Sequence, residues 1–230
     1  MTDSTTGRAR PLVAVRYGPR CVPVMQLAAA AGGLCDLLWI IDTAVPGMAE
    51  MADLLNRFGP IVDLQGMSAE EAVKTLADWE PDGITTYLDA GMVELARMAE
   101  KLSLPFHSPA TAAALTDKAR QRRALADAGL DIPPCFLVRP GQSEPELSAV
   151  EAEVGWPAIL KPRSAQGSRC TFLVRDGAEL KKLLDALGPG RSGMVLEGYL
   201  ADDPARDGDP YAGYVSVESV VADGAISPWP

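Results

Sequence analysis

The sequence has very little histidine and no clustered cysteine. It contains one histidine, His107, and four cysteines with no C-x-x-C pair, namely Cys21, Cys35, Cys135 and Cys170. Zinc sites and disulfide frameworks require such residues at short, regular spacings. We therefore expect neither a zinc centre nor a disulfide-stapled fold.

Long apolar runs are also missing. No stretch approaches the roughly 18–20 consecutive apolar residues that cross a bilayer. The first ten residues, M-T-D-S-T-T-G-R-A-R, lack the apolar core of a secretory signal. Hydrophobic residues make up 47% of the chain and charged residues 23%, as in ordinary globular proteins. We expect a folded cytoplasmic protein with no membrane partner and a short disordered lead over residues 1–10.

Positive charge is scarce relative to negative charge. The chain has 21 Lys and Arg against 31 Asp and Glu, a formal net charge of −10, which would repel a phosphate backbone over most of the surface. We therefore expect no nucleic-acid partner. One short segment departs from this pattern, with Lys118, Arg120, Arg122 and Arg123 close together. That segment suits a small anionic ligand better than a long one.

The dinucleotide fingerprint G-x-G-x-x-G is absent, yet residues 12–109 alternate short apolar runs with amphipathic stretches. This alternation predicts βαβ units with a parallel sheet. Polar residues at the strand ends, Tyr17, Asp42 and Asp89, would then project into a crevice at the carboxyl edge. Ser68 and Glu71 form a predicted capping box. The expected strands are 12–17, 37–42, 61–64 and 83–88, and the expected helices are 24–31, 48–58, 69–79 and 92–102.

The second half of the chain has a different pattern. A helix is predicted over 117–128 with Thr116 as its N-cap, and the run Ile132-Pro133-Pro134 ends it. After it we expect an α+β arrangement and then a strand from Tyr214 to Val221 with a turn at Asp223-Gly224. The expected strands of the α+β part are 135–138, 158–161, 171–174 and 194–196, and its helices are 144–153 and 178–187.

The strongest chemical signal is P-A-I-L-K-P-R-S-A-Q-G-S-R, residues 157–169. An apolar strand delivers Lys161, and a loop of small residues from Ser164 to Ser168 follows directly. Such a loop exposes backbone amides to an anion, and a lysine adds a point charge, so the pattern predicts a phosphate site. A solvated lysine before an ordinary hairpin turn is the alternative interpretation.

Three further positions are candidates, each with a simpler alternative. Lys118 lies in the first turn of a helix, where a cation opposes the helix dipole unless an anion is near; a solvated helix face stabilised by Asp117 is the alternative. Glu197 ends an apolar strand and could present a carboxylate to a heterocycle, or face water. Glu218 lies in the alternating run V-S-V-E-S-V, which is equally typical of a half-exposed strand.

In combination these segments resemble the ATP-grasp superfamily, especially its carboxylate–amine ligases of the L-amino acid ligase type. The resemblance rests on A-E-K-L-S-L-P-F-H-S-P, L-T-D-K-A-R-Q-R-R, P-A-I-L-K-P with its G-S-R loop, M-V-L-E-G-Y-L and Y-V-S-V-E-S-V-V-A-D-G. It implies an α/β fold with a pre-ATP-grasp Rossmann-like parallel sheet, an α+β small lobe and the truncated start of a large lobe. The implied parts are a lead (1–10), a pre-ATP-grasp domain (11–110), a linker helix with the small lobe (111–200) and the start of the large lobe (201–230).

The resemblance also implies a set of ATP-binding residues. Lys118 and Lys161 correspond to the two lysines that hold the nucleotide phosphates, and Ser164, Gly167 and Ser168 belong to the loop that folds over them. Glu197 corresponds to the acid that faces the adenine amino group, and Tyr199 and Leu200 offer backbone groups to the ring. Tyr214 stands where relatives place a ribose-binding acid, so Glu218 becomes the substitute. No catalytic nucleophile is implied.

The implied activity is ATP-dependent joining of a small carboxylate to an amine through an acyl-phosphate. ATP and Mg²⁺ are the implied cofactors, with the magnesium ligands expected downstream of this chain; we therefore expect no turnover from the 230 residues alone. A homodimer is compatible with the resemblance. The alternative is a nucleotide-binding or regulatory module without ligase activity, whereas a dehydrogenase fragment is disfavoured by the absent glycine fingerprint.

Overall fold

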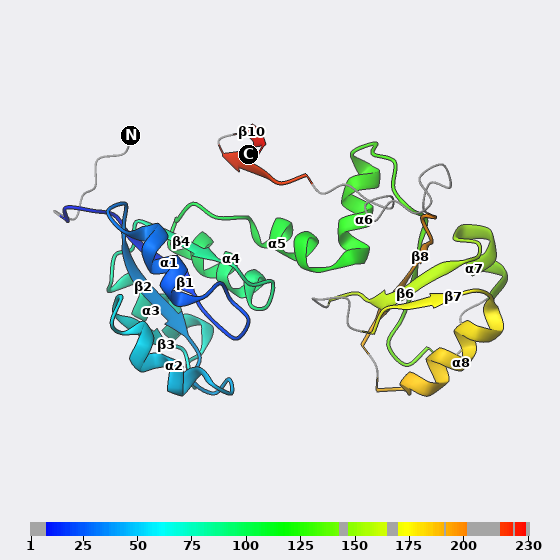
Figure 1. Ribbon diagram of the computed structural model, residues 1–230, viewed down its shortest axis with the longest axis horizontal. Helices are drawn as coiled ribbons and strands as arrows, with labels where there is room; N and C mark the ends of the chain where they lie inside the picture. The colour runs from blue at the N-terminus through cyan, green and yellow to red at the C-terminus, as the bar shows by residue number, and fades with distance from the viewer. Residues whose placement is uncertain are drawn as a thin grey trace. The chain divides into compact units, whose positions relative to one another are not determined.

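The computed structural model describes residues 8–142, 147–164, 170–190, 192–201, 217–222 and 224–228. The chain divides into two compact units. The first contains Met1–Ile132 and Arg163–Arg169, and the second contains Pro133–Pro162 and Cys170–Pro230. Figure 1 shows the helices and strands of both units.

The first unit is built on a four-stranded parallel sheet in the order β3-β2-β1-β4. The chain adds β2 and β3 on one side of β1 and then returns to its other side for β4, so the strand order reverses between β1 and β4. Open parallel sheets bind ligands at such a reversal, at the carboxyl edge. The strands are β1 (Leu12–Arg16), β2 (Asp36–Ile41), β3 (Ile61–Asp63) and β4 (Gly83–Thr86).

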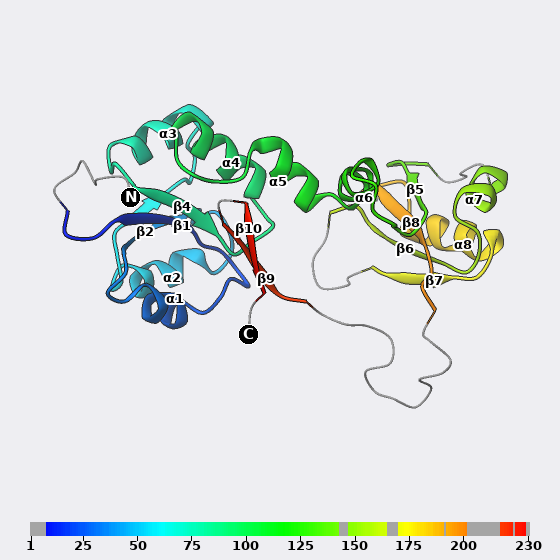
Figure 2. The same ribbon diagram turned by 90° about the horizontal axis from the view of Figure 1, so that it is seen from above.

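Helices cover both faces of this sheet, as Figure 2 shows. Alternate strand residues point to opposite faces. One set, including Leu38 and Ile40, packs against α3 (Ala69–Ala77) and α4 (Met92–Lys101). The other set, including Trp39 and Ile41, packs against α1 (Val24–Ala31) and α2 (Met48–Leu55). The predicted parallel α/β half is therefore confirmed: α1 has the expected bounds, and α2, α3 and α4 end one to three residues earlier than expected.

The segment after α4 contains a helix that the sequence analysis did not predict. Helix α5 (Pro109–Thr116) starts with Ser108 as N-cap and proline at its first position. Thr116 is its last residue and donates its hydroxyl to the Ala112 carbonyl, so Thr116 is not the N-cap of the next helix. That role belongs to Asp117, which accepts from the amides of Ala119 and Arg120 at the start of α6 (Lys118–Asp127).

The second unit contains a four-stranded antiparallel sheet in the order β5-β8-β6-β7. Its core lies on one face, where Leu160 and Leu196 meet Val150 of α7 and Leu180 and Leu184 of α8. The strands are β5 (Cys135–Val138), β6 (Ala158–Pro162), β7 (Phe172–Val174) and β8 (Met194–Gly198), and the helices are α7 (Leu147–Glu153) and α8 (Gly177–Leu187). This is the predicted α+β arrangement.

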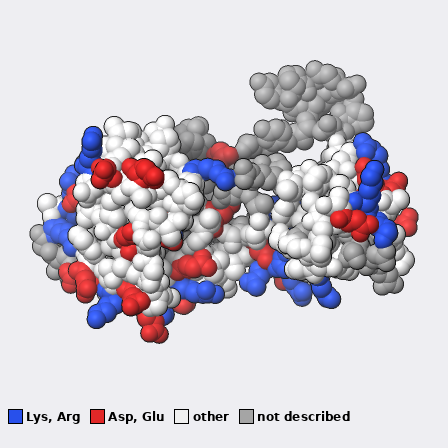
Figure 3. Space-filling view, turned by 90° about the horizontal axis from the view of Figure 1, so that it is seen from below, with Lys and Arg blue, Asp and Glu red and all other residues white. Residues whose placement is uncertain are grey.

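A separate antiparallel hairpin is formed by β9 (Ser219–Ala222) and β10 (Ala225–Pro228). It agrees with the predicted strand from Ser219 onward, whereas Val217 and Glu218 lie before β9, and residues 214–216 and Asp223 of that prediction lie outside the described residues. On the face drawn in Figure 3, acidic and basic side chains are interspersed rather than gathered by sign. Among the described helices, none combines the length and apolar character that crossing a bilayer requires.

Candidate functional site

Lys161 and Glu197 are brought together on the sheet of the second unit. Lys161 of β6 pairs in register with Val195 of β8, and Glu197 lies two residues further along β8 on the same face. Diagonal neighbours of this kind are within reach of long side chains. Lys161 Nζ donates to Glu197 Oε2 at 2.6 Å. Only 5% of the Glu197 side chain and 20% of the Lys161 side chain are exposed.

This ion pair lies on the sheet face that points away from α7 and α8. The core residues of these strands are at alternate positions, so Lys161 and Glu197 point the other way. Leu137 and Leu173 share that second face and are 36% and 38% exposed. A sheet face that combines partly exposed apolar side chains with one desolvated lysine–carboxylate pair can hold a ligand that is both apolar and anionic.

The strand end after Glu197 offers backbone groups to a ligand. The Gly198 amide donates to the Pro134 carbonyl and the Tyr199 amide to the Pro157 carbonyl, at 2.9 and 3.1 Å, so both amides are engaged. The side chains of Tyr199 and Leu200 are 42% and 73% exposed. The next backbone groups along this strand end are the Tyr199 carbonyl and the Leu200 amide.

Lys118 and Ser164 line a cavity of about 700 Å³ in the first unit. The cavity lies at the carboxyl edge of the parallel sheet, where Pro19 and Arg20 follow β1 and Asp89 follows β4. It thus coincides with the reversal of strand order between β1 and β4, where the fold places ligands. The structure brings the predicted Lys118 and Ser164 to one cavity of the first unit, whereas Lys161, Glu197, Tyr199 and Leu200 belong to the second.

The position of Lys118 is fixed by an ion pair that the sequence analysis missed. Arg163 donates from Nε to Asp117 Oδ1 at 3.0 Å and from a terminal nitrogen to Oδ2. The Arg163 carbonyl accepts from the Lys118 amide at 3.0 Å. Partial burial alone would raise the pKa of Asp117, but the hydrogen bonds from Arg163 and the α6 amides outweigh it and hold that pKa below its ordinary value. Asp117 therefore caps α6 and binds Arg163 as a carboxylate.

The other predicted site residues have different positions. Gly167 and Ser168 lie outside the described residues. Glu218 is exposed next to β9. Tyr17, expected at the strand-end crevice, is instead buried and packs edge-on against Trp39 with ring centroids 5.6 Å apart. The residues that the structure describes contain no group of three or more His, Cys, Asp or Glu side chains placed to hold a metal ion, so we assign no magnesium ligand among them.

No family model matches the sequence. A curated relative, the formate-dependent phosphoribosylglycinamide formyltransferase of Prochlorococcus marinus, is 30% identical over 135 residues, which are 56% of this chain and 34% of that protein. The chain thus spans about a third of this relative's length.

Two solved structures share the fold over a larger part of the chain. An L-amino acid ligase from Bacillus licheniformis superposes with a TM-score of 0.65 and 20% sequence identity, and the match covers 95% of this chain and 49% of the ligase. The N5-carboxyaminoimidazole synthetase from Staphylococcus aureus, solved with ADP, superposes with a TM-score of 0.62 and 18% identity, and the match covers 84% of this chain and 48% of the synthetase. The chain spans about half the length of each.

These similarities define the fold class, which is that of ATP-grasp proteins: a parallel α/β unit followed by an antiparallel α+β unit. Within that class the similar structures are carboxylate–amine ligases, and this chain matches an ATP-grasp portion of about half their length. The resemblance and the fold class predicted from the sequence are both confirmed.

Proposed function

We propose that this chain is the ATP-binding portion of an ATP-dependent carboxylate–amine ligase that works through an acyl-phosphate. The observation that carries the proposal is the desolvated Lys161–Glu197 pair on the face of the second sheet opposite its core, next to the strand end at Tyr199 and Leu200. The ADP bound to the synthetase of similar fold supports a nucleotide as the ligand.

Each residue has a definite part in the proposed nucleotide site. Lys161 Nζ uses one N–H on Glu197, and its remaining N–H groups can donate to phosphate oxygens. Glu197 holds Lys161 in place and presents its carboxylate edge to the adenine amino group. The Tyr199 carbonyl and Leu200 amide form an acceptor–donor pair of the kind that reads an adenine edge. Exposed Leu137 and Leu173 supply apolar contact for a base.

In the first unit, Lys118 and Ser164 are proposed to contact phosphate from the cavity that they line. The Asp117–Arg163 pair fixes the first turn of α6, from which Lys118 projects. Gly167, Ser168 and Glu218 remain predictions for the loop over the phosphates and for the ribose, and the domain scheme derived from the sequence remains a prediction as well.

The proposed reaction has two steps. A substrate carboxylate oxygen bonds to the γ-phosphorus of ATP while the bond from that phosphorus to the β,γ-bridging oxygen breaks, giving ADP and an acyl-phosphate. An amine nitrogen then bonds to the acyl carbon, phosphate leaves and the amine loses a proton. Neither step needs a protein nucleophile, because such transfers depend on positioning and charge neutralisation. Lysines such as Lys118 and Lys161 supply that neutralisation, and magnesium remains a prediction.

Nucleotide titration by calorimetry tests the proposal. The wild-type chain should bind ATP in preference to NAD, and Lys161→Met should weaken ATP binding at least about tenfold, roughly 1.4 kcal/mol. Lys182→Met is the matched control, because Lys182 is an exposed lysine on α8, the helix that covers the opposite face of the same sheet. The assignment of Lys161 would be contradicted if wild type and Lys161→Met bound ATP equally well and had the same circular dichroism spectrum. A preference for NAD over ATP would contradict the proposed function.

A further inference from the structure

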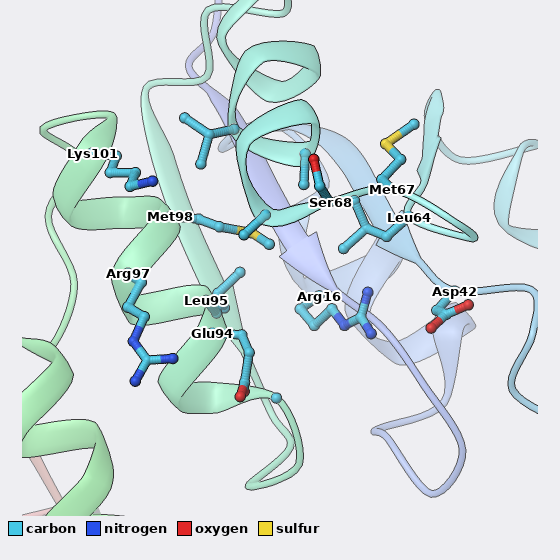
Figure 4. A pocket seen from close by; sticks show the side chains of 14 residues that line it. Arg16, Asp42, Leu64, Met67, Ser68, Glu94, Leu95, Arg97, Met98 and Lys101 are labelled. Carbon is cyan, nitrogen blue, oxygen red and sulfur yellow. The ribbon is translucent and has the colours of Figure 1, made fainter.

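A second cavity in the first unit, about 450 Å³ in volume, lies between α3 and α4 beside the carboxyl end of the sheet. Figure 4 shows Leu95 and Met98 projecting from α4 toward its middle, with Leu64 and Met67 on the opposite side. Arg16, the last residue of β1, lies between these two sides. The volume is in the range of small-molecule sites, and the lining is mainly apolar with a few polar groups, as in such sites.

Arg16 is a partly buried cation without an ion pair among the described residues. Its Nη1 atom is buried and has no hydrogen-bond partner there. Desolvation by burial lowers the pKa of the Arg16 guanidinium, and the carboxylates of Asp42, Glu94 and Asp63 oppose that effect from a distance. Arginine nevertheless stays charged in proteins. A guanidinium held in this way is a group that an anion would stabilise.

Two of the three carboxylates that act on Arg16, Asp42 and Asp63, already accept hydrogen bonds from other donors. Asp63 accepts from the Thr43 amide and hydroxyl and from the Gln65 amide, each at 3.0 Å or less. Asp42 accepts from the Ala44 amide at 3.0 Å. These bonds hold Asp63 at the end of β3 and Asp42 in the turn that follows β2. Neither carboxylate forms an ion pair with Arg16 among the described residues.

The remaining charges around the cavity also favour an anion. Arg97 and Lys101 lie on its α4 side, so three cations line it against the two acids Asp42 and Glu94. The first turn of α3 adds Ser68 and Ala69 to the lining, and a helix N-terminus carries partial positive charge. A purely apolar ligand would leave the Arg16 guanidinium as it is, and a cation would be repelled by it.

From these observations we propose that the cavity between α3 and α4 binds a small organic monocarboxylate with an aliphatic body, its carboxylate on Arg16 and its body against Leu64, Leu95 and Met98. Gly91 and Glu94 line both this cavity and the one that contains Lys118. None of the described residues assigned to the nucleotide lines the Arg16 cavity. Binding of the monocarboxylate therefore does not depend on the proposed ATP site.

The test uses the full chain labelled with ¹³C at methionine methyl groups and titrated with sodium hexanoate. Met67 and Met98 line the cavity, whereas Met48 lies in the core on the other face of the sheet and Met194 in the core of the second unit. Hexanoate should shift the Met67 and Met98 signals in a saturable way and leave Met48 and Met194 unchanged. Hexan-1-ol, which has the same body without the charge, should bind at least about tenfold more weakly.

Two variants test whether hexanoate binding requires the charge of Arg16. Arg16→Gln should weaken hexanoate binding at least about tenfold, and Arg57→Gln, an exposed arginine after α2, should leave it unchanged. Equal binding of hexanoate and hexan-1-ol by the wild-type chain would overturn the proposal even if Arg16→Gln failed to fold. The absence of a saturable shift at millimolar hexanoate would also overturn it, because the cavity would then hold water only. Shifts at Met48 and Met194 as large as those at Met67 and Met98 would overturn it as well.

Discussion

Lys161 and Glu197 are 36 residues apart in the chain but form a 2.6 Å ion pair because β6 and β8 are antiparallel neighbours. The pair lies on the face opposite the hydrophobic core, yet its carboxylate is almost fully buried. A buried pair of this kind adds little net stability when intact, but either partner is costly to leave alone.

We therefore expect Lys161→Met to lower the free energy of unfolding of the second unit by on the order of 3 kcal/mol, because Glu197 loses its cation in a desolvated position. Glu197→Gln should also destabilise. The double variant should be clearly more stable than the sum of the single effects predicts, because it leaves no unpaired charge. Urea unfolding of the wild type, the two single variants and the double variant gives a double-mutant cycle. Strictly additive effects would show that the two side chains do not interact in solution.

The Asp117–Arg163 pair predicts a specific pH dependence. The folded-state pKa of Asp117 is lowered from the ordinary value of 3.8. Because the folded-state pKa is lowered, the ionised Asp117 carboxylate contributes its full stabilisation above pH 3.8. That stabilisation is lost as the pH falls through the folded-state pKa. Asp117→Asn keeps an N-cap side chain and removes the charge. This substitution should lower the free energy of unfolding by about 1 kcal/mol near neutral pH, a value that allows for solvent screening at the partly exposed Arg163. In strong acid it should have almost no effect.

Urea unfolding from neutral pH to below pH 3.8 measures this difference between wild type and Asp117→Asn. Asp53→Asn, an exposed aspartate on α2, is the control and should show no comparable loss. A difference between wild type and Asp117→Asn that persists unchanged in acid would mean that the ion pair is not its source.

The end of α4 offers a stabilising substitution. Ser103 has a φ of 56° directly after the helix, its amide donates to the Glu100 carbonyl, and the Leu104 amide donates to the Ala99 carbonyl. These two bonds form a Schellman motif, in which the left-handed position favours glycine. Ser103→Gly should raise the free energy of unfolding by about 1 kcal/mol, whereas Ser103→Ala should give no gain. Thermal unfolding of both variants checks this, and a stabilising alanine would contradict the conformational explanation.

Trp39 leads to a prediction about an unpaired buried donor. The side chain is fully buried on β2, and Nε1 has no hydrogen-bond partner among the described residues. Trp39→Phe removes that donor and keeps an aromatic edge against Tyr17, so the loss of packing is offset. We expect the free energy of unfolding to change by no more than about 1 kcal/mol, compared with a loss of about 2–5 kcal/mol for Leu38→Ala at the equally buried preceding position. A similar loss in both variants, measured by chemical unfolding, would contradict this expectation.

The sequence predicted the parallel half of the fold well because its apolar runs and capping signals are local. Ser68 and Glu71 do form the expected capping box. Helix α5 was not predicted because its residues, P-A-T-A-A-A-L-T, have no strong apolar periodicity. The signal that could have identified it was Ser108 before Pro109, an N-cap with proline at the first helical position.

The candidate site was predictable only as separate positions. Strand ends and small-residue loops pointed to Lys161, Ser164 and Glu197 individually. The pairing of Lys161 with Glu197 depends on the register of two strands, and the pairing of Asp117 with Arg163 joins residues 46 apart, so neither follows from local patterns. Arg16 was missed because a charged residue after an apolar run normally marks only the end of a strand.

The two units have separate hydrophobic cores, and this affects how the chain loses its structure. Trp39 is buried in the core of the first unit, and Trp156 packs against the core of the second. Cooperative all-or-none unfolding is the behaviour of single cores, and chains with more than one core often populate states in which one part has melted. Fluorescence from Trp39 and from Trp156 would then follow two transitions with different midpoints, and a single melting temperature would not describe this protein.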